Sequence, residues 1–222
     1  MIRVYVVVEG QTEEAVVKSI LEPHLSSMGV YLFPIIVKTS PGHRGGGTHW
    51  AKWENDIRNL LKQHKGQGVR VTTLFDLFRL PKGFPELDEH GADTNTSRRC
   101  DALAKAIDEI FDDRRFIPYL QRHELEALVL ASLDGLEEFF DDSDALKGLS
   151  DLKNEIGDQA PEDINDGPET APSKRLMRYI PGYSKTLHGP MAIEDTGLQA
   201  VRERCPRFDQ WIKILEALAD RD

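Results

Sequence analysis

A short apolar run that ends abruptly in an acid is the feature that most constrains the fold of this chain. Residues 4–8 are four valines and a tyrosine, a run rich in β-branched side chains, and Glu9 and Gly10 end it. A pattern with helical spacing then opens at Thr12. β-branched residues suit a buried strand, and glycine suits a tight turn. The segment therefore predicts a buried strand, a turn and a helix N-terminus of an α/β domain.

Glu9 and Glu13 are candidate metal ligands. In a parallel α/β sheet, ligands bind beyond the carboxyl ends of the strands, which is where Glu9 lies. Glu13 follows on the first helical turn, so the two carboxylates can converge on one point. They would repel one another in isolation, and a cation between them is the simplest reason for the arrangement. The alternative is that Glu13 only interacts favourably with the helix dipole.

Acids recur at two further strand ends. Asp76 follows the apolar run 69–75, and Glu124 and Glu126 follow the apolar segment 115–120. The carboxyl ends of parallel strands meet at one edge of a sheet, so the recurrence predicts a Mg²⁺ or Mn²⁺ site there. Because Glu124 and Glu126 diverge if they are on a helix, we expect at most one of them to reach the site.

Length and charge limit the classes of protein. The 222 residues, 40% hydrophobic and 30% charged, suit one domain with an accessory part. We predict an α/β domain over residues 1–134 and a helical C-terminal extension over residues 135–222 packed on it. A formal net charge of −10 argues against coating nucleic acid through bulk charge, but it allows an acidic metal centre with a local basic patch.

Cysteine usage and hydropathy predict a cytoplasmic protein without a membrane anchor. Cys100 and Cys205 lie far apart and lack metal-ligand spacing, which is typical of reduced thiols. No apolar run approaches the roughly 20 residues that are needed to span a membrane.

Several segments together carry a resemblance to a known family. They are Val8–Glu13, Asp76 with the pairs Leu80–Pro81 and Phe84–Pro85, Gln121–Leu128, and Pro172–Arg175. These segments resemble a bacterial family of Toprim-like proteins that carries a domain-of-unknown-function name, and the resemblance spans nearly the whole chain. Similarity to the wider Toprim group is looser. That group includes topoisomerases, primases and the nucleases of the overcoming-lysogenisation-defect type.

The resemblance implies a Toprim-like, mostly parallel sheet flanked by helices, with Mg²⁺ held for phosphodiester chemistry. Glu9 matches the first-strand glutamate of that group, and Glu13 matches the second acid of the Glu-Gly-x-x-Glu form in its nuclease branch. Asp76 matches the first aspartate of the Asp-x-Asp motif. Phe78 stands where that motif has its second aspartate, so one ligand is missing.

The resulting prediction is a nuclease dependent on Mg²⁺ or Mn²⁺, with DNA favoured over RNA as substrate. Glu124 or Glu126 would replace the missing ligand. Lys174 and Arg175 are expected to face the acidic cleft and hold a phosphate, with Lys185 a further candidate, and His123 is a candidate proton relay. The resemblance also implies an ATPase partner in phage defence.

Two other functions stay open at this stage. The chain could be a non-catalytic subunit that binds an ATPase partner, which the negative charge and the missing aspartate favour. It could also be a small-molecule nucleotide phosphohydrolase, in which the loop containing Gly45–Gly47 closes over the substrate. The acids at three strand ends argue against the first of these alternatives.

Overall fold

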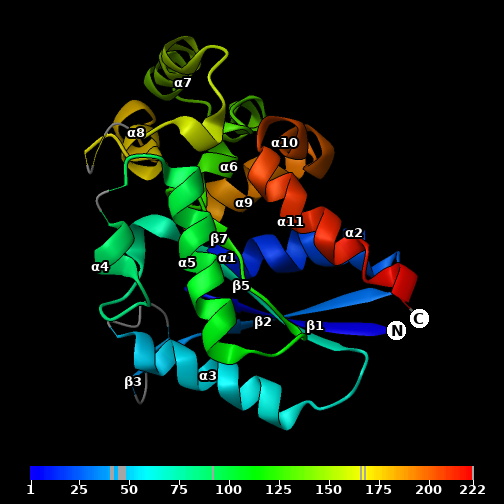
Figure 1. Ribbon diagram of the computed structural model, residues 1–222. Helices are drawn as coiled ribbons and strands as arrows, with labels where there is room; N and C mark the ends of the chain where they lie inside the picture. Colours follow the sequence, from blue (N-terminus) through cyan, green and yellow to red (C-terminus); the bar gives the residue numbers. More distant parts are fainter. Residues whose placement is uncertain (41–42, 45–48, 92, 166, 168, 222) are drawn as a thin grey trace.

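The computed structural model describes residues 1–40, 43–44, 49–91, 93–165, 167 and 169–221. Its centre is a parallel sheet with the strand order β2-β1-β5-β6, in which β7 also pairs with β5 (Figure 1). The strands are β1 (Ile2–Val8), β2 (Val30–Ile36), β5 (Val69–Asp76), β6 (Phe116–Ile117) and β7 (Leu120–Gln121). A separate antiparallel pair consists of β3 (Lys38–Ser40) and β4 (His43–Arg44). The prediction of an α/β fold with a mostly parallel sheet is confirmed.

Helices cover the sheet and make up the C-terminal part of the chain (Figure 1). The first group is α1 (Gln11–Val16), α2 (Glu22–Ser26), α3 (Trp50–Gln63), α4 (Leu87–His90) and α5 (Thr96–Phe111). The second group is α6 (Glu126–Leu130), α7 (Ser143–Ile156), α8 (Pro172–Tyr179), α9 (Lys185–Thr196), α10 (Leu198–Arg204) and α11 (Pro206–Glu216). None of the helices in the described ranges is long and apolar enough to cross a membrane.

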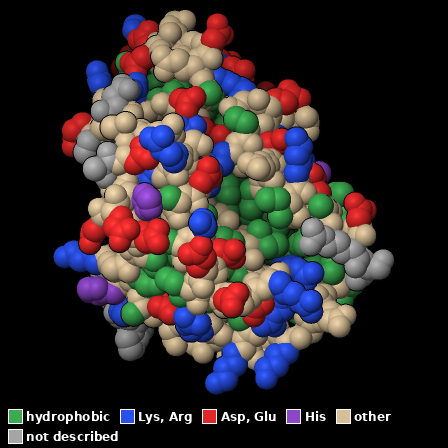
Figure 2. Space-filling view, in the orientation of Figure 1, with side chains coloured by type: hydrophobic (Ala, Val, Ile, Leu, Met, Phe, Trp, Pro, Cys, Tyr) green, Lys and Arg blue, Asp and Glu red, His purple; other side chains and the backbone are tan. Residues whose placement is uncertain are grey.

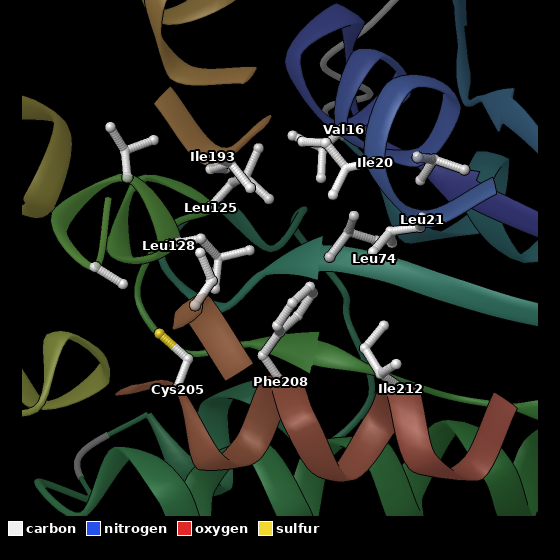
Figure 3. Packing of buried hydrophobic residues seen from close by; sticks show 14 of the residues in the cluster. Val16, Ile20, Leu21, Leu74, Leu125, Leu128, Ile193, Cys205, Phe208 and Ile212 are labelled. Carbon is white, nitrogen blue, oxygen red and sulfur yellow. The ribbon is translucent and has the colours of Figure 1, made fainter. Parts of the chain in front are cut away.

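Each face of the sheet has its own hydrophobic core. Side chains of α3 and α5 pack on one face with Val7, Val71 and Phe75. The other face packs against α1, α2 and the C-terminal helices, and Figure 3 shows Leu74 of β5 among side chains from α6, α9 and α11. This second core includes residues on both sides of position 134, where we predicted a domain boundary. The boundary itself stays a prediction.

The helix predicted over residues 12–26 forms with an irregular middle. Its central turn, Val17–Leu21, is a π-helix that joins α1 to α2. Pro23 follows in the first turn of α2. Proline has no N–H to donate to the preceding turn, so the regular ladder of hydrogen bonds cannot pass through it. The widened turn is the local solution, and it keeps the two helical pieces continuous.

The segment expected to form one strand over residues 115–120 is split into β6 and β7. Both halves pair with β5 in the same register, and Pro118 and Tyr119 lie between them. The Thr73 hydroxyl accepts the Tyr119 N–H at 2.8 Å and donates to the Tyr119 carbonyl at 2.7 Å. A side chain thus takes the place of a backbone acceptor at the interruption.

Helix α11 is hydrogen-bonded to the sheet on the face that also packs against α1 and α2. The indole N–H of Trp211 donates to the Thr72 hydroxyl at 3.0 Å, and that hydroxyl donates to the Ile117 carbonyl at 2.6 Å. The Trp211 ring also stacks on Tyr119 with centroids 4.4 Å apart. The C-terminal helices therefore fix the strand ends that carry the acidic residues.

The segment 77–95, which joins β5 to α5, contains a short 3₁₀ turn at Leu77–Arg79 and the helix α4. Asn95 caps α5, because its side-chain oxygen accepts the Arg98 N–H. The glycine loop at residues 45–47 lies outside the described residues.

We predict that Thr73→Val destabilises the protein while Thr73→Ser is tolerated. Valine keeps the shape but leaves the buried Tyr119 N–H without its acceptor, which should lower the free energy of unfolding by about 2 kcal/mol. Serine keeps the hydroxyl and loses one methyl group, at a cost of about 1 kcal/mol. Urea unfolding of both variants measures the difference. Equal destabilisation by the two substitutions would show that the hydroxyl is unimportant.

Candidate active site

A cavity of about 570 Å³ lies where the carboxyl ends of β1 and β5 meet α1, α6 and α9. Four carboxyl side chains line this acidic cavity, namely those of Glu9, Glu13, Asp76 and Glu126. Gln11, Thr12, Arg79, Lys82 and Lys185 supply further polar groups, and Trp53 of α3 forms part of the wall. Residues that are far apart in the sequence therefore share one enclosure at one edge of the sheet.

Backbone hydrogen bonds join the three strand ends. The Asp76 N–H donates to Glu9 Oε1 at 2.7 Å, so the acid of β1 is held by the last residue of β5. The Leu125 N–H donates to Asp76 Oδ1 at 2.8 Å. Each bond occupies one oxygen of its carboxyl group and leaves the other for a ligand. The carboxyl groups are therefore oriented by the fold.

Gly10 allows Glu13 to approach the cluster closely. A Cβ atom added at Gly10 would lie 3.3 Å from Glu13 Oε2, tighter than most Cβ contacts. Gly10 also immediately precedes α1, so Glu13 lies on the first turn of that helix. The turn at Gly10 is thus short and carries no side chain at this position, as the sequence predicted.

Glu126 lines the acidic cavity, whereas Glu124 is not among its lining residues and lies beside it, near the Lys185 ammonium group. His123 has a left-handed backbone (φ 61°), and α6 begins only at Glu126. Glu124 is therefore not on a helix, and its side chain need not point away from that of Glu126. Lys185 Nζ lies 3.1 Å from Glu126 Oε1 and 3.8 Å from Glu124 Oε1. The other oxygen of Glu124 accepts the Ser173 N–H at 3.0 Å.

Burial and mutual repulsion shift the titration of these acids. Burial, followed by the charge of Glu13, raises the pKa of Glu9 to about 8, although the hydrogen bond from Asp76 lowers it in part. Burial and the charges of Glu9 and Glu13 raise the pKa of Asp76 well above its usual value. Burial also raises the pKa of Glu126, against the opposing charge of Lys185. The cluster therefore favours protons or cations that neutralise it.

The cations that the structure places at the acidic cavity differ from those expected. Lys174 is exposed, and Arg175 donates to the Thr170 carbonyl and pairs with Glu155, so neither lines the cavity. Lys185 does line it. Arg79 and Lys82, which our sequence analysis did not select, lie there too. The available signal was their position in the segment directly after Asp76.

His123 is next to Glu124 in the chain but lines another cavity, together with Arg122 and Asn165. Its Nδ1 lies 3.1 Å from the Asn165 side-chain nitrogen, and burial lowers its pKa to about 4. A neutral imidazole is therefore the resting form near pH 7. Its role as a proton relay stays a prediction.

The acidic cavity fits a hard divalent cation by its donor chemistry. Mg²⁺ and Mn²⁺ prefer carboxylate oxygens, and the free oxygens of Glu9 and Asp76 face a shared space with Glu13. Across the described ranges, no group of three or more Asp, Glu, His or Cys side chains is placed so that it could hold a metal ion. Carboxylates that repel one another need a cation to draw them together.

Two of the three comparisons with known proteins match nearly the whole chain. A family model described as "Domain of unknown function (DUF4276)" matches residues 8–216. No curated protein matches the chain. The C-terminal region of the Burkholderia pseudomallei OLD protein is similar at 15% identity and a TM-score of 0.41, over 96% of this chain and 99% of that one. The C-terminal region of the Xanthomonas campestris pv. campestris OLD protein gives 18% identity and 0.41, over 96% and 95%.

The metal-free protein should lose stability as pH rises, and Glu9→Gln should remove part of that loss. The folded pKa of Glu9, about 8, lies above its ordinary value of 4.5, so the folded state holds more protons between these limits. The free energy of unfolding then falls as pH increases through this window. Glutamine mimics the protonated acid and does not titrate.

The measurement is urea unfolding in a chelator from pH 5 to pH 8. The stability of Glu9→Gln relative to wild type should increase with pH, by an amount on the order of a few kcal/mol. Glu14→Gln, on the helix that follows Glu9 and ion-paired with Lys18 at the surface, is the matched control. If the unfolding free energies of Glu9→Gln and wild type changed with pH in parallel, Glu9 would not be the source of the pH dependence.

Proposed function

The chain belongs to the family described as "Domain of unknown function (DUF4276)", and we propose that it is a divalent-metal-dependent phosphodiesterase that cleaves nucleic acid. The observation that carries the proposal is the convergence of acidic side chains from three strand ends on one cavity with cations at its wall. Acids alone would suit a simple ion site. Cations beside them suit a ligand that is itself negatively charged, such as a phosphodiester.

Glu9, Glu13 and Asp76 would hold the ion. Glu124 and Glu126, expected to replace the aspartate that the motif lacks at Phe78, would instead be neutralised by Lys185. A bound divalent ion lowers the pKa of a water and stabilises charge on phosphoryl oxygens. The residues of the chain orient and neutralise the reacting groups. The backbone bonds to Glu9 and Asp76 orient these two carboxyl groups, and the remaining ligand side chains would move closer when an ion binds.

Arg79, Lys82 and Lys185 would bind the phosphate. Their side chains line the acidic cavity from the segment after β5 and from the start of α9. Arg79 Nε lies 3.8 Å from Glu124 Oε1, and most of its side chain is exposed, so it can turn to an incoming anion at low cost. Cations so placed stabilise the additional negative charge that develops on a transferring phosphoryl group.

A second, basic cavity favours a polymer over a small nucleotide. It measures about 430 Å³ and is lined by Arg58, Leu61, Lys62, Lys65, Phe111, Asp113 and Arg115. Figure 2 shows Lys and Arg side chains gathered at the lower edge of the molecule, where α3 lies. In a chain of net charge −10, such a local concentration of cations marks where a polyanion would bind.

The two cavities share helix α3. Trp53 lines the acidic cavity, and Arg58 and Lys62 of the same helix line the basic cavity. Nine residues separate Trp53 from Lys62, which is about 13 Å along a helix. Nine positions also make two and a half helical turns, so Trp53 and Lys62 project from opposite sides of α3, and a nucleic-acid strand that bound both cavities would pass around this helix. The ATPase partner that the resemblance implies stays a prediction.

Asp76→Asn should abolish both ion binding and cleavage. Asparagine nearly preserves the shape of the side chain and removes the charge that would hold the ion. We expect Mn²⁺ to raise the melting temperature of wild type by binding its native state, and we expect no such rise for the variant. Cleavage of DNA with Mn²⁺ should fall by about 100-fold or more. Asp158→Asn, at an exposed acid, is the control.

Two results would refute this proposal. One is equal cleavage by wild type and Asp76→Asn, which would place the reaction elsewhere. The other is the absence of any heat or thermal shift when wild type is titrated with saturating Mn²⁺. Circular dichroism of the variant checks that the fold is intact before either result is interpreted.

Replacing both Lys62 and Lys65 by alanine should weaken nucleic-acid binding and its salt dependence. In the described part of the chain neither lysine has an ion-pair partner, so both are available to phosphate. Losing two phosphate contacts should reduce the slope of log K against log salt by about 1 to 2. Fluorescence anisotropy over a salt series measures it. The control replaces Lys105 and Lys147, which pair with neighbouring acids. An unchanged slope in the Lys62 and Lys65 variant would exclude the basic cavity as a nucleic-acid binding site.

A further inference from the structure

We infer that Lys185 occupies the position of a second cation, so that the acidic cavity binds one divalent ion rather than two. This inference rests on the proposed function and specifies its ion stoichiometry. The acids divide into two groups by their surroundings. The ammonium group of Lys185 lies between Glu124 and Glu126, whereas Glu9, Glu13 and Asp76 have no basic partner within ion-pair distance in the described residues.

The group around Lys185 is buried and geometrically specific. The side chains of Glu124 and Glu126 are only 2% and 5% exposed, and Lys185 is about one quarter exposed. A carboxylate so buried is costly unless a cation compensates it. The ammonium group meets Glu126 at hydrogen-bond distance and Glu124 slightly farther away. A second divalent ion would have to displace it from both.

The packing of α9 fixes Lys185 in this position. Gly189 lies one turn after Lys185 on the same helical face. A Cβ atom at Gly189 would lie 3.3 Å from Tyr183 Oη and 3.4 Å from a Val129 methyl group, with Thr12 just beyond. The missing side chain lets α9 approach both α1 and α6, the helices that carry Glu13 and Glu126. The close packing of α9 thus positions Lys185 at the wall of the acidic cavity.

The charge of the whole cluster agrees with one ion. The five carboxyl groups of Glu9, Glu13, Asp76, Glu124 and Glu126 share this region with Lys185 and with Arg79 and Lys82, which are farther from the acids. One divalent ion then brings the net charge of these groups to zero. A second divalent ion would make the cluster positive while Lys185 remained in place. The ion is expected at the Glu9, Glu13 and Asp76 group, which has no cation of its own.

The test is the stoichiometry of Mn²⁺ binding to the full chain. Calorimetric titration should give one equivalent for wild type. Lys185→Met keeps the length of the side chain but frees Glu124 and Glu126, and it should bind two equivalents. Electron paramagnetic resonance should show an isolated Mn²⁺ in wild type and a spin-coupled pair in Lys185→Met. Lys185→Arg and Lys174→Met, the latter at an exposed position, should stay at one.

Each contrary result has a distinct meaning. Two equivalents in wild type would overturn this inference and leave the proposed function standing. One equivalent in a folded Lys185→Met would show that the lysine does not exclude a second ion. No Mn²⁺ binding by wild type would overturn the proposed function and this inference together. Because the wild-type stoichiometry is itself decisive, the test does not depend on the variant folding.

Discussion

The mutual repulsion of buried carboxylates is the constraint on which the rest of this structure depends. Glu9, Asp76 and Glu126 come from three separate strand ends and meet at one cavity, where burial raises the pKa of each. Desolvation alone disfavours their charged forms, and proximity adds to the cost. A fold tolerates such an arrangement only where its core is stable enough to hold the groups together. The two hydrophobic cores on the faces of the sheet provide that stability.

The backbone holds the acids in place with few side-chain partners. The N–H groups of Asp76, Leu125 and Ser173 each donate to a carboxyl oxygen of the cluster. Such bonds become charge-assisted, and therefore stronger, when the acids ionise, and their backbone donors lose no side-chain entropy. The cluster is consequently pre-oriented for ligands that bind at its remaining oxygens.

The C-terminal helices are part of the site as well as of the core. α8 supplies the Ser173 N–H to Glu124, and α9 supplies Lys185. α11 binds the sheet through Trp211 and so supports the interrupted strand that leads to Glu124. A chain without these helices would lose both a counter-charge and a positioning contact. The helical extension is thus as important for the chemistry as the sheet that carries the acids.

The sequence by itself determined the order of elements along the chain, namely the apolar runs, the acids that end them and the helices that follow. It predicted Glu9 and Asp76 at strand ends, with Glu13 on the helical turn after Glu9, because a parallel sheet places its carboxyl ends at one edge. It could not decide the conformations of Glu124 and Glu126, which depend on a left-handed His123. Nor could it select Lys185 over Lys174 and Arg175, because the packing of α9 depends on contacts between residues far apart in the chain. Such long-range packing is decided only in the tertiary structure.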